Sequence, residues 1–275
     1  MFIDGKKMAQ ELYDELKNDI EKSGLRPTLA AVLVGSNSAS LRYIAQKKKF
    51  ADYVWIDFKL IELKQNVTQI ELEKKIVELN ENNSIDGYIV QLPLPDHIEE
   101  KKIIEKINPK KDVDGFHPEN MWKILIGDTS GLVPCTPAGV MHMLEKMETP
   151  LVGKKVTIVW RSNIVWKPLA ALLINYGATV CTCNSKTPDI RDYTSQSDVV
   201  IMATGKPHLL NVWMVKIGTT IIDVWFSVID GKIYGDCDTQ ILEKVWNTIT
   251  PVPGWVGPLT VAMLMKNTFQ AAKNK

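Results

Sequence analysis

Short apolar runs alternate along the chain with segments whose apolar residues recur at helical spacing, and this alternation constrains the fold more than any other feature. Residues 29–34 and 88–92 are apolar runs of the length of buried strands, and residues 56–63 alternate as a half-buried strand does. Helix-patterned segments separate these runs. Because parallel strands need a crossover that is usually a helix, this order predicts a largely parallel α/β sheet.

Three helices are predicted in the first half of the chain. The first has apolar residues at four-residue spacing, namely Met8, Leu12, Leu16 and Ile20. Gly24 follows where a C-terminal cap belongs. Residues 36–38 can cap a second helix that runs to about Tyr53. Thr68 and Glu71 form a capping-box pattern before the third.

The second half of the chain repeats the alternation. Residues 108–120 are rich in turn formers, and Thr136-Pro137 supplies an N-cap followed by Pro at the first helical position, so the domain crossover is placed here. Strands are predicted at 156–159, 179–183, 199–202 and 220–224, with a helix at 167–176. This succession resembles a doubly wound nucleotide-binding unit.

The expected fold class is α/β with two domains, because 275 residues are more than a usual single domain contains. An N-terminal α/β domain covers residues 1–120, and a Rossmann-like doubly wound domain covers 121–255. The tail, residues 256–275, has a helix pattern after a Pro-rich turn. We expect this tail to pack back on the first domain.

Charge and cysteine content exclude several classes of partner. Lys+Arg number 33 and Asp+Glu 32, a formal charge of +1, which argues against binding to nucleic acid or to a membrane surface. No apolar stretch reaches the roughly 18 residues of a membrane helix, and residues 1–7 lack the apolar core of a secretion signal, so we expect a cytoplasmic protein. The four cysteines contain no CxxC pair, which indicates neither zinc nor a disulfide framework.

Candidate site residues follow two of the predicted strands. Tyr43 and Lys47 are four residues apart on the second predicted helix and therefore share a face, as many solvated Tyr/Lys pairs do. Gln91 interrupts an apolar run and places an amide at the carboxyl end of a parallel strand, where ligands collect, although such an amide can also cap a loop. Asp112 and Asp114 place two carboxylates in a predicted exposed turn, which alone is an ordinary Asp turn.

Together these residues belong to five motifs that occur in the order seen in the bifunctional methylenetetrahydrofolate dehydrogenase/cyclohydrolases. The motifs are Tyr43-x-x-x-Lys47, Asp86 to Pro95, Lys111 to Phe116, Pro134 to Pro137 and Thr250 to Pro253. The chain resembles a full-length member of that family. The resemblance implies that the first domain is catalytic and binds folate, that the second binds NADP, and that the protein is a homodimer.

The resemblance also implies roles for the candidate residues. Lys47 is expected to be the main catalytic residue, with Tyr43 and Gln91 orienting it, and Asp114 to hold the pterin ring. Ser40, one turn before Tyr43, is expected to help line the pocket. The implied reactions are oxidation of 5,10-methylenetetrahydrofolate and hydrolysis of the methenyl product to 10-formyltetrahydrofolate. A lysine is suited to the proton transfer that hydrolysis requires.

The cofactor-binding residues implied by the family follow the strands of the second domain. They are Trp160, Arg161, Ser162, Ser185 and Phe226. A cation and a hydroxyl at positions 161 and 185, instead of an acidic residue for a ribose hydroxyl, favour NADP over NAD. The backbone at Phe226 is expected to meet the nicotinamide side.

Six tryptophans stand where the family usually has glycine. They are Trp55, Trp122, Trp160, Trp166, Trp225 and Trp255. Random drift would scatter substitutions over many residue types, so this one-way pattern leads to the hypothesis that UGA codons for glycine were decoded as tryptophan. The alternative is a genuine chain that has lost cofactor binding, a folate-binding pseudoenzyme. A shikimate-type dehydrogenase is a third interpretation, but it leaves the motifs around Gln91 and Pro253 unexplained.

Overall fold

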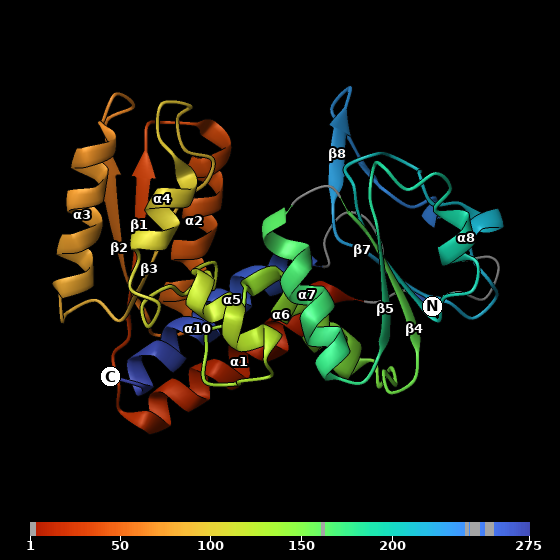
Figure 1. Cartoon of the computed structure of the whole chain (residues 1–275). Helices are drawn as coiled ribbons and strands as arrows, with labels where there is room; N and C mark the ends of the chain where they lie inside the picture. The colour runs from red at the N-terminus through yellow and green to blue at the C-terminus, as the bar shows by residue number, and fades with distance from the viewer. Residues whose placement is uncertain (1–3, 161–162, 240–241, 243–247, 251–255) are drawn as a thin grey trace. The chain divides into compact units, whose positions relative to one another are not determined.

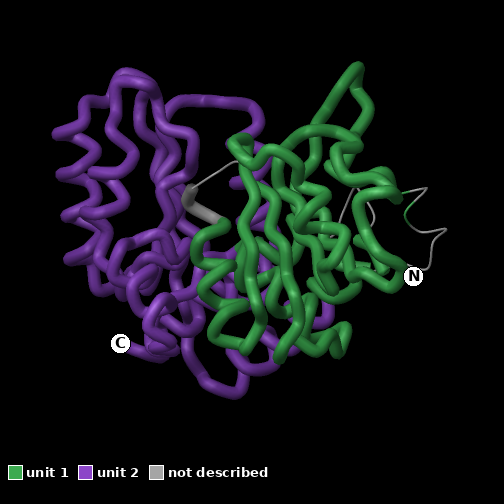
Figure 2. The backbone as a smooth tube through the Cα atoms, turned by 45° about the vertical axis from the view of Figure 1, so that its right-hand side comes forward, with its two compact units in different colours: residues 1–9, 136–260 green, residues 10–135, 261–275 purple. Residues whose placement is uncertain are grey.

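The structure is a computed structural model that describes residues 4–160, 163–239, 242, 248–250 and 256–275. The chain forms two compact units, coloured separately in Figure 2. One unit consists of residues 10–135 and 261–275, and the other of residues 1–9 and 136–260. Each is an α/β unit built on a parallel sheet, so the predicted α/β, two-domain fold class is confirmed.

The unit of residues 10–135 and 261–275 has a three-stranded parallel sheet in the order β2-β1-β3. Its elements, with α1 beginning just before the unit, are α1 (Gly5–Ser23), β1 (Thr28–Val34), α2 (Ser38–Tyr53), β2 (Asp57–Leu63), α3 (Gln69–Glu81), β3 (Gly87–Val90), α4 (Glu100–Lys106) and α5 (Pro118–Leu125) (Figure 1). Every residue of β1 is buried, as expected of a central parallel strand covered on both faces. The edge strand β2 has only exposed and half-buried residues, and its alternation is interrupted where Lys59 and Leu60 are both exposed.

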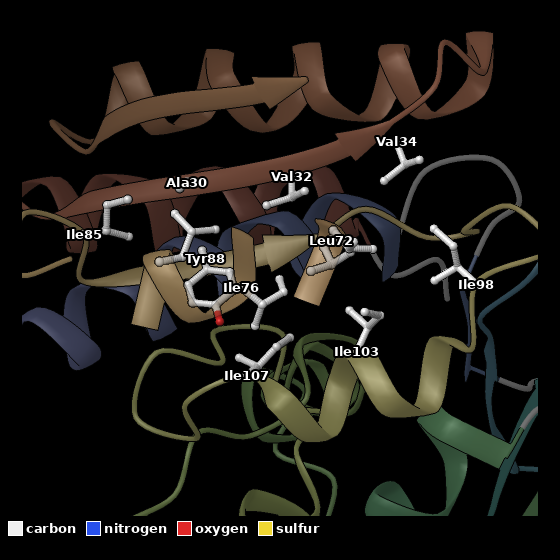
Figure 3. Close-up of a cluster of buried hydrophobic side chains, with 12 residues drawn as sticks. Ala30, Val32, Val34, Leu72, Ile76, Ile85, Tyr88, Ile98, Ile103 and Ile107 are labelled. Atoms are coloured by element: carbon white, nitrogen blue, oxygen red, sulfur yellow. The ribbon is translucent and has the colours of Figure 1, made fainter. Parts of the chain in front are cut away.

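A hydrophobic core holds one face of this sheet to two helices. Figure 3 shows side chains of β1 and β3 lying against those of α3 and α4. Val32 and Leu72 are both fully buried in this cluster. At roughly 1.5 to 3 kcal/mol for each fully buried side chain of this size, the cluster fixes the sheet on which the candidate residues stand.

Local signals in the sequence cap two of these helices as predicted. Gly24 has a φ of +68°, the left-handed conformation that terminates α1. At the start of α3, the Glu71 N–H donates to Thr68 Oγ1 at 3.2 Å and the Thr68 N–H donates to Glu71 Oε2 at 2.8 Å, so the capping box is confirmed. The short helices α4 and α5 were not predicted, although Pro118 begins α5 directly after the His117 cap.

The second unit has a five-stranded parallel sheet in the order β10-β7-β6-β4-β5. Its elements are α6 (Cys135–Lys146), β4 (Lys155–Trp160), α7 (Asn163–Asn175), β5 (Thr179–Cys183), α8 (Arg191–Thr194), β6 (Val199–Ala203), η1 (Val212–Met214), β7 (Thr220–Asp223), β8 (Phe226–Ile229), β9 (Lys232–Gly235) and β10 (Thr248–Ile249). The chain passes from β4 to β5 on one side and returns to β6 on the other, which is the topological switch of doubly wound folds.

This half differs from the sequence prediction in several details, and the helix predicted at 167–176 begins earlier, at Asn163. Thr136 is not an N-cap, because α6 begins one residue earlier at Cys135, and its hydroxyl instead lies 3.1 Å from Thr260 Oγ1. The antiparallel pair β8 and β9, outside the main sheet, was not predicted.

No helix in the described part of the chain has both the length and the apolar character needed to cross a membrane.

The C-terminal helix α10 (Val256–Lys273) contributes residues 261–275 to the unit that also contains residues 10–135. Asn267 anchors it there, since its side-chain amide donates to the carbonyl oxygens of Val113 at 2.9 Å and Val133 at 2.8 Å. One amide thus joins the helix to two loop segments that are far away in the sequence.

The tryptophans at expected glycine positions have different environments. Trp55 has a φ of +64°, which glycine adopts without strain and tryptophan does not. Trp122 lies exposed inside α5, and Trp166 is buried in α7. Trp55 is the one such tryptophan with positive φ among the residues described, and Trp255 lies outside them.

Candidate functional site

Two predicted residues from separate elements meet at the carboxyl ends of β1 and β3. Lys47, from α2, donates from Nζ to Gln91 Oε1 at 3.0 Å, and Gln91 follows β3 directly. The Gln91 Nε2 donates to the Leu92 carbonyl oxygen at 2.7 Å, and this bond fixes which end of the amide faces the lysine. The chain runs from β1 to β2 on one side and then to β3 on the other, so this pair lies at a topological switch.

The start of α2 presents the other two predicted residues of this helix. Asn37 caps it, because its Oδ1 accepts the N–H groups of Ala39 at 2.9 Å and Ser40 at 3.2 Å. Ser40, in the first turn of α2, is buried, whereas Tyr43 is 48% exposed. The exposed ring and the half-buried Lys47 lie one turn apart, so the phenol is available to a bound molecule and the amine is partly sheltered.

The Asp112 to Asp114 segment is not the exposed turn that the sequence suggested. Asp112 is 1% exposed and accepts hydrogen bonds from the His117 N–H at 2.7 Å, the Gly115 N–H at 3.1 Å and the Asn120 side chain at 3.1 Å. Burial raises the pKa of Asp112 to about 6, and these three donors oppose the rise. The prediction failed because no local pattern reveals that residues 109–120 fold around this carboxylate.

Asp112 thereby holds the loop that carries Asp114. Gly115, with a φ of +76°, lets this loop pass the 132–134 segment, because a Cβ there would lie 2.5 Å from the Pro134 nitrogen. Asp114 is half-buried. Burial raises the pKa of the Asp114 carboxyl, and the charge of Lys47 opposes that rise, so the two groups are electrostatic neighbours.

Cys135 and Asn267 are two residues of this region that were not predicted as site residues. The Cys135 thiol is buried and donates to the Val113 carbonyl oxygen at 3.3 Å. Burial raises its pKa well above the usual value, with a further rise from Asp114 and a decrease from Lys47. No short spacing links Asn267 to this loop, so sequence reasoning could not have placed it here.

In the described part of the chain the four cysteines are free, and no cluster of three metal-ligating side chains occurs.

The candidate cofactor edge lies at the carboxyl ends of β4 and β6, the switch point of the second sheet. Trp160 ends β4 and pairs with Ala203 of β6. Its indole N–H is buried and has no hydrogen-bond partner among the residues described. Arg161 and Ser162, which follow it, lie outside the described residues.

Two further predicted cofactor residues are accessible at this edge. After β5, Asn184 and Thr187 close a turn, since the Asn184 N–H donates to Thr187 Oγ1 at 3.0 Å and the Thr187 N–H to the Asn184 carbonyl oxygen at 3.0 Å. The turn leaves Ser185 exposed, with the exposed Lys186 as a neighbouring cation that the sequence prediction did not include. Phe226 begins β8 and is 42% exposed.

The chain matches two family models that together cover most of its length. Residues 3–114 match "Tetrahydrofolate dehydrogenase/cyclohydrolase, catalytic domain". Residues 134–275 match "Tetrahydrofolate dehydrogenase/cyclohydrolase, NAD(P)-binding domain". The match decides against the shikimate-type alternative.

Individual relatives are similar over the whole chain. The bifunctional protein FolD of Bacillus licheniformis is 46% identical over 275 residues, which cover 98% of this chain and 96% of the relative. The crystal structure of the bifunctional FolD of Campylobacter jejuni has a TM-score of 0.96 at 44% identity, covering 100% and 99% of the two chains. The FolD of Trypanosoma brucei, solved with NADP cofactor and an inhibitor, has a TM-score of 0.93 at 36% identity, covering 100% and 97%. The chain therefore belongs to the tetrahydrofolate dehydrogenase/cyclohydrolase family.

Proposed function

We propose that this chain oxidises 5,10-methylenetetrahydrofolate with NADP and hydrolyses the methenyl product to 10-formyltetrahydrofolate. The observation that carries the proposal is the Lys47 Nζ to Gln91 Oε1 bond of 3.0 Å at a switch point, with Asp114 as an electrostatic neighbour. It occurs in a chain whose two halves match the catalytic and the NAD(P)-binding models of the family.

Lys47 is the residue proposed to move protons in the hydrolytic step. Water that attacks the methenyl carbon must lose a proton, and an amine placed within reach can accept it. The amide of Gln91 keeps Lys47 Nζ at a defined position, because its other end is held by the Leu92 carbonyl oxygen. Tyr43, exposed one turn earlier, is proposed to orient the folate ring system together with Ser40.

Asp114 is proposed to bind the pterin. Its carboxylate has acceptor oxygens that suit the neighbouring ring N–H and amino groups of a pterin. The buried Asp112 holds the loop on which Asp114 stands, through hydrogen bonds to Gly115 and His117. A fixed loop reduces the entropy lost when the substrate is oriented for reaction.

The described residues of the second unit fit NADP. At the carboxyl end of β5 the exposed groups are the hydroxyl of Ser185 and the ammonium of Lys186, which suit a phosphate and not a ribose hydroxyl. When bound, NADP supplies the hydride acceptor for the oxidation. We propose that Ser185 and Arg161 hold its 2′-phosphate, that Trp160 and Ser162 border the phosphate turn, and that the backbone at Phe226 faces the nicotinamide.

The proposed function is tested with purified protein, 5,10-methylenetetrahydrofolate and NADP or NAD. We expect NADP-dependent oxidation followed by accumulation of 10-formyltetrahydrofolate, with lower activity on NAD. A protein that binds tetrahydrofolate but neither binds NADP nor oxidises the substrate would overturn the proposal and establish the pseudoenzyme alternative.

We also propose that the enzyme is a cytoplasmic homodimer that binds neither nucleic acid nor membranes. Four free cysteines fit a reducing compartment.

The β8 and β9 pair exposes apolar side chains, namely Phe226, Val228, Ile229 and Ile233, as protein contact surfaces do. Light scattering should give twice the monomer mass, and Val228→Asp should yield monomers while an exposed control, Val152→Asp, should not. A monomeric wild-type protein would refute the dimer.

A further inference from the structure

The loop after β6 is held by a buried carboxylate from a distant part of the chain. Asp236, which follows β9, is 0% exposed, and its Oδ2 accepts hydrogen bonds from the N–H groups of Thr204 and, at 3.1 Å, Gly205. A carboxylate that accepts backbone N–H groups in a buried site makes charge-assisted bonds, which are stronger than neutral ones. Asp236 therefore determines the conformation of the loop at the carboxyl end of β6.

This loop is connected to the strand proposed to face the nicotinamide. The Gly205 carbonyl oxygen accepts the Ser227 hydroxyl at 3.0 Å, and Ser227 follows Phe226 in β8. Gly205 has a φ of +66°, and a Cβ there would lie 3.1 Å from the Trp225 ring. A continuous set of contacts thus runs from Asp236 through Gly205 to Ser227, beside Phe226.

A second buried carboxyl group lies beside the first. Asp223, at the end of β7, is 0% exposed, and its Oδ2 accepts the Cys237 N–H at 2.8 Å, one residue beyond Asp236. Burial, and then the charge of Asp236, raise the pKa of Asp223 to about 8. Burial raises the pKa of Asp236, while the Thr204 and Gly205 N–H groups lower it.

The Cys237 thiol also faces this pair, and burial, followed by the charge of Asp223, raises its pKa well above its usual value. The Cys237 thiol therefore stays neutral, and only the two carboxyls share charge near neutral pH. Two like charges cannot both be ionised cheaply in a buried site, so the charge of Asp236 favours the protonated form of Asp223. The backbone donors around Asp236 keep the negative charge there and the proton on Asp223.

We propose that Asp236 is a positioning residue of the cofactor site, and that protonation of its buried neighbour Asp223 makes cofactor affinity depend on pH. The inference rests on the proposed NADP-dependent function. Near pH 7 the pair carries one charge and the loop is held. As pH rises through about 8, both carboxyls ionise and repel each other. The hydrogen bonds from the Thr204 and Gly205 N–H groups to Asp236 are then weakened.

Protonation of Asp223 makes folding stability depend on pH in a definite direction. The folded pKa of Asp223 lies above its unfolded value of 3.8, so the folded state binds the extra proton and loses stability as pH rises from about 4 to about 8. The form that binds the cofactor best is the protonated pair. Affinity should therefore fall on the alkaline side, which is the opposite of what titration of a phosphate ligand would cause.

The test measures NADP binding by calorimetry, and melting temperature, at several pH values from about 6.5 to about 9.5. For the wild-type protein we expect the NADP dissociation constant to rise at least about threefold from pH 7 to pH 9. Asp223→Asn should keep the affinity at pH 7 and lose most of the pH dependence. Asp236→Asn should weaken NADP binding about tenfold or more at every pH, since the amide presents a donor to the loop N–H groups. The exposed Asp189→Asn is the matched control and should follow the wild-type curve.

The outcomes separate the inference from the function on which it rests. Equal pH slopes for wild type and Asp223→Asn, with NADP bound by both, would remove Asp223 as the source of the pH dependence and leave the proposed function intact. An unchanged dissociation constant in Asp236→Asn would remove Asp236 as a positioning residue. If Asp236→Asn does not fold, Asp236→Glu, which keeps the charge at a displaced position, takes its place in the same assay. Absence of NADP binding by the wild-type protein at all pH values would instead refute the cofactor assignment.

Discussion

The proposed folate site and the proposed cofactor site occupy equivalent places in their sheets but depend on different atoms. Both lie at carboxyl strand ends where the chain switches direction, beside β1 and β3 in one unit and β4 and β6 in the other. The first consists of side chains that bond to one another, such as Lys47 and Gln91. A phosphate turn depends on backbone N–H groups that must approach the ligand closely.

This difference determines which substitutions each site tolerates. A side-chain site survives changes at neighbouring glycines provided its own helices and loops keep their positions. A backbone site does not, because a Cβ obstructs close approach to phosphate. Trp160 ends β4 and Trp166 lies inside α7, on either side of the proposed phosphate turn, so we expect them to affect dehydrogenation more than hydrolysis.

The largest expected effect is on the folate side. Lys47→Met should reduce cyclohydrolase activity by at least about 100-fold, since general acid–base groups contribute 10² to 10⁴-fold, while folate binding changes by a modest factor. Hydrolysis of methenyltetrahydrofolate is followed directly, and folate binding by calorimetry. Lys48→Met, at the exposed next position of α2, is the matched control. Undiminished hydrolysis in Lys47→Met would remove this lysine from the mechanism.

Asp112 should give the next largest effect, as a pH dependence of stability. Its folded pKa of about 6 lies above the ordinary 3.8, so its protonated form is favoured in the folded state and stability is lost as pH rises from about 4 to about 6. The shift corresponds to about 3 kcal/mol. Asp112→Asn cannot titrate, so urea unfolding should show its free energy of unfolding improving relative to wild type between these pH values.

Asp128 provides a control of opposite sign. The Ser130 N–H donates to Asp128 Oδ1 at 2.8 Å and lowers the pKa of this exposed carboxyl. Its contribution is present above the unfolded pKa and is lost as pH falls through the lower folded value. The free energy of unfolding of Asp128→Asn should therefore fall relative to that of the wild type as pH rises. The same pH trend in both variants would contradict the assignment to Asp112.

On the cofactor side, Arg161→Ala should weaken NADP binding by about 1.5 to 3 kcal/mol, the range for a charged hydrogen bond, with a smaller change for NAD. Titration of each cofactor measures both dissociation constants. Arg191→Ala, an exposed arginine of the same unit, should leave them unchanged. Equal losses for NADP and NAD would show that Arg161 does not recognise the 2′-phosphate.

The smallest effects concern the tryptophans and separate strained from unstrained positions. Trp55 has a φ of +64°, and a left-handed conformation costs a non-glycine residue roughly 1 to 2 kcal/mol. Trp122 lies inside α5, where glycine costs about 1 kcal/mol in a helix. Trp55→Gly should thus be more stable than Trp122→Gly by at least about 1 kcal/mol in urea unfolding. The reverse order would mean that other contacts offset the strain at Trp55, for example the cation–π contact of Lys17 Nζ, which lies 5.2 Å from the centre of its ring.

The common origin of the six tryptophans is tested on the coding DNA. UGA at positions 55, 122, 160, 166, 225 and 255 would support glycine decoded as tryptophan, and ordinary UGG codons would refute it. Restoring all six glycines should raise the melting temperature, NADP affinity and oxidation rate. A protein that melts as high and turns over as fast with its tryptophans would show that they are genuine residues.

The sequence alone determined the features that depend on near neighbours in the chain. The predicted strand 179–183 has the observed bounds of β5, and the caps at Gly24 and Thr68 form as expected. Strand and helix periods, caps and glycine turns arise from contacts within a few residues. The roles of Lys47 and Gln91 came instead from the resemblance of their motifs to those of the family, because the spacing of Tyr43 and Lys47 alone is common on solvated helix faces.

Only the tertiary structure decided which distant groups meet. Lys47 and Gln91 are 44 residues apart and reach 3.0 Å only because β1 and β3 pair in register. The burial of Asp112 and the pairing of Asp236 with Thr204 leave no periodic signal, because one buried carboxylate among loop N–H groups looks like any turn residue in the sequence. Local patterns specify elements, whereas the charge and protonation of a site depend on what the paired elements place around it.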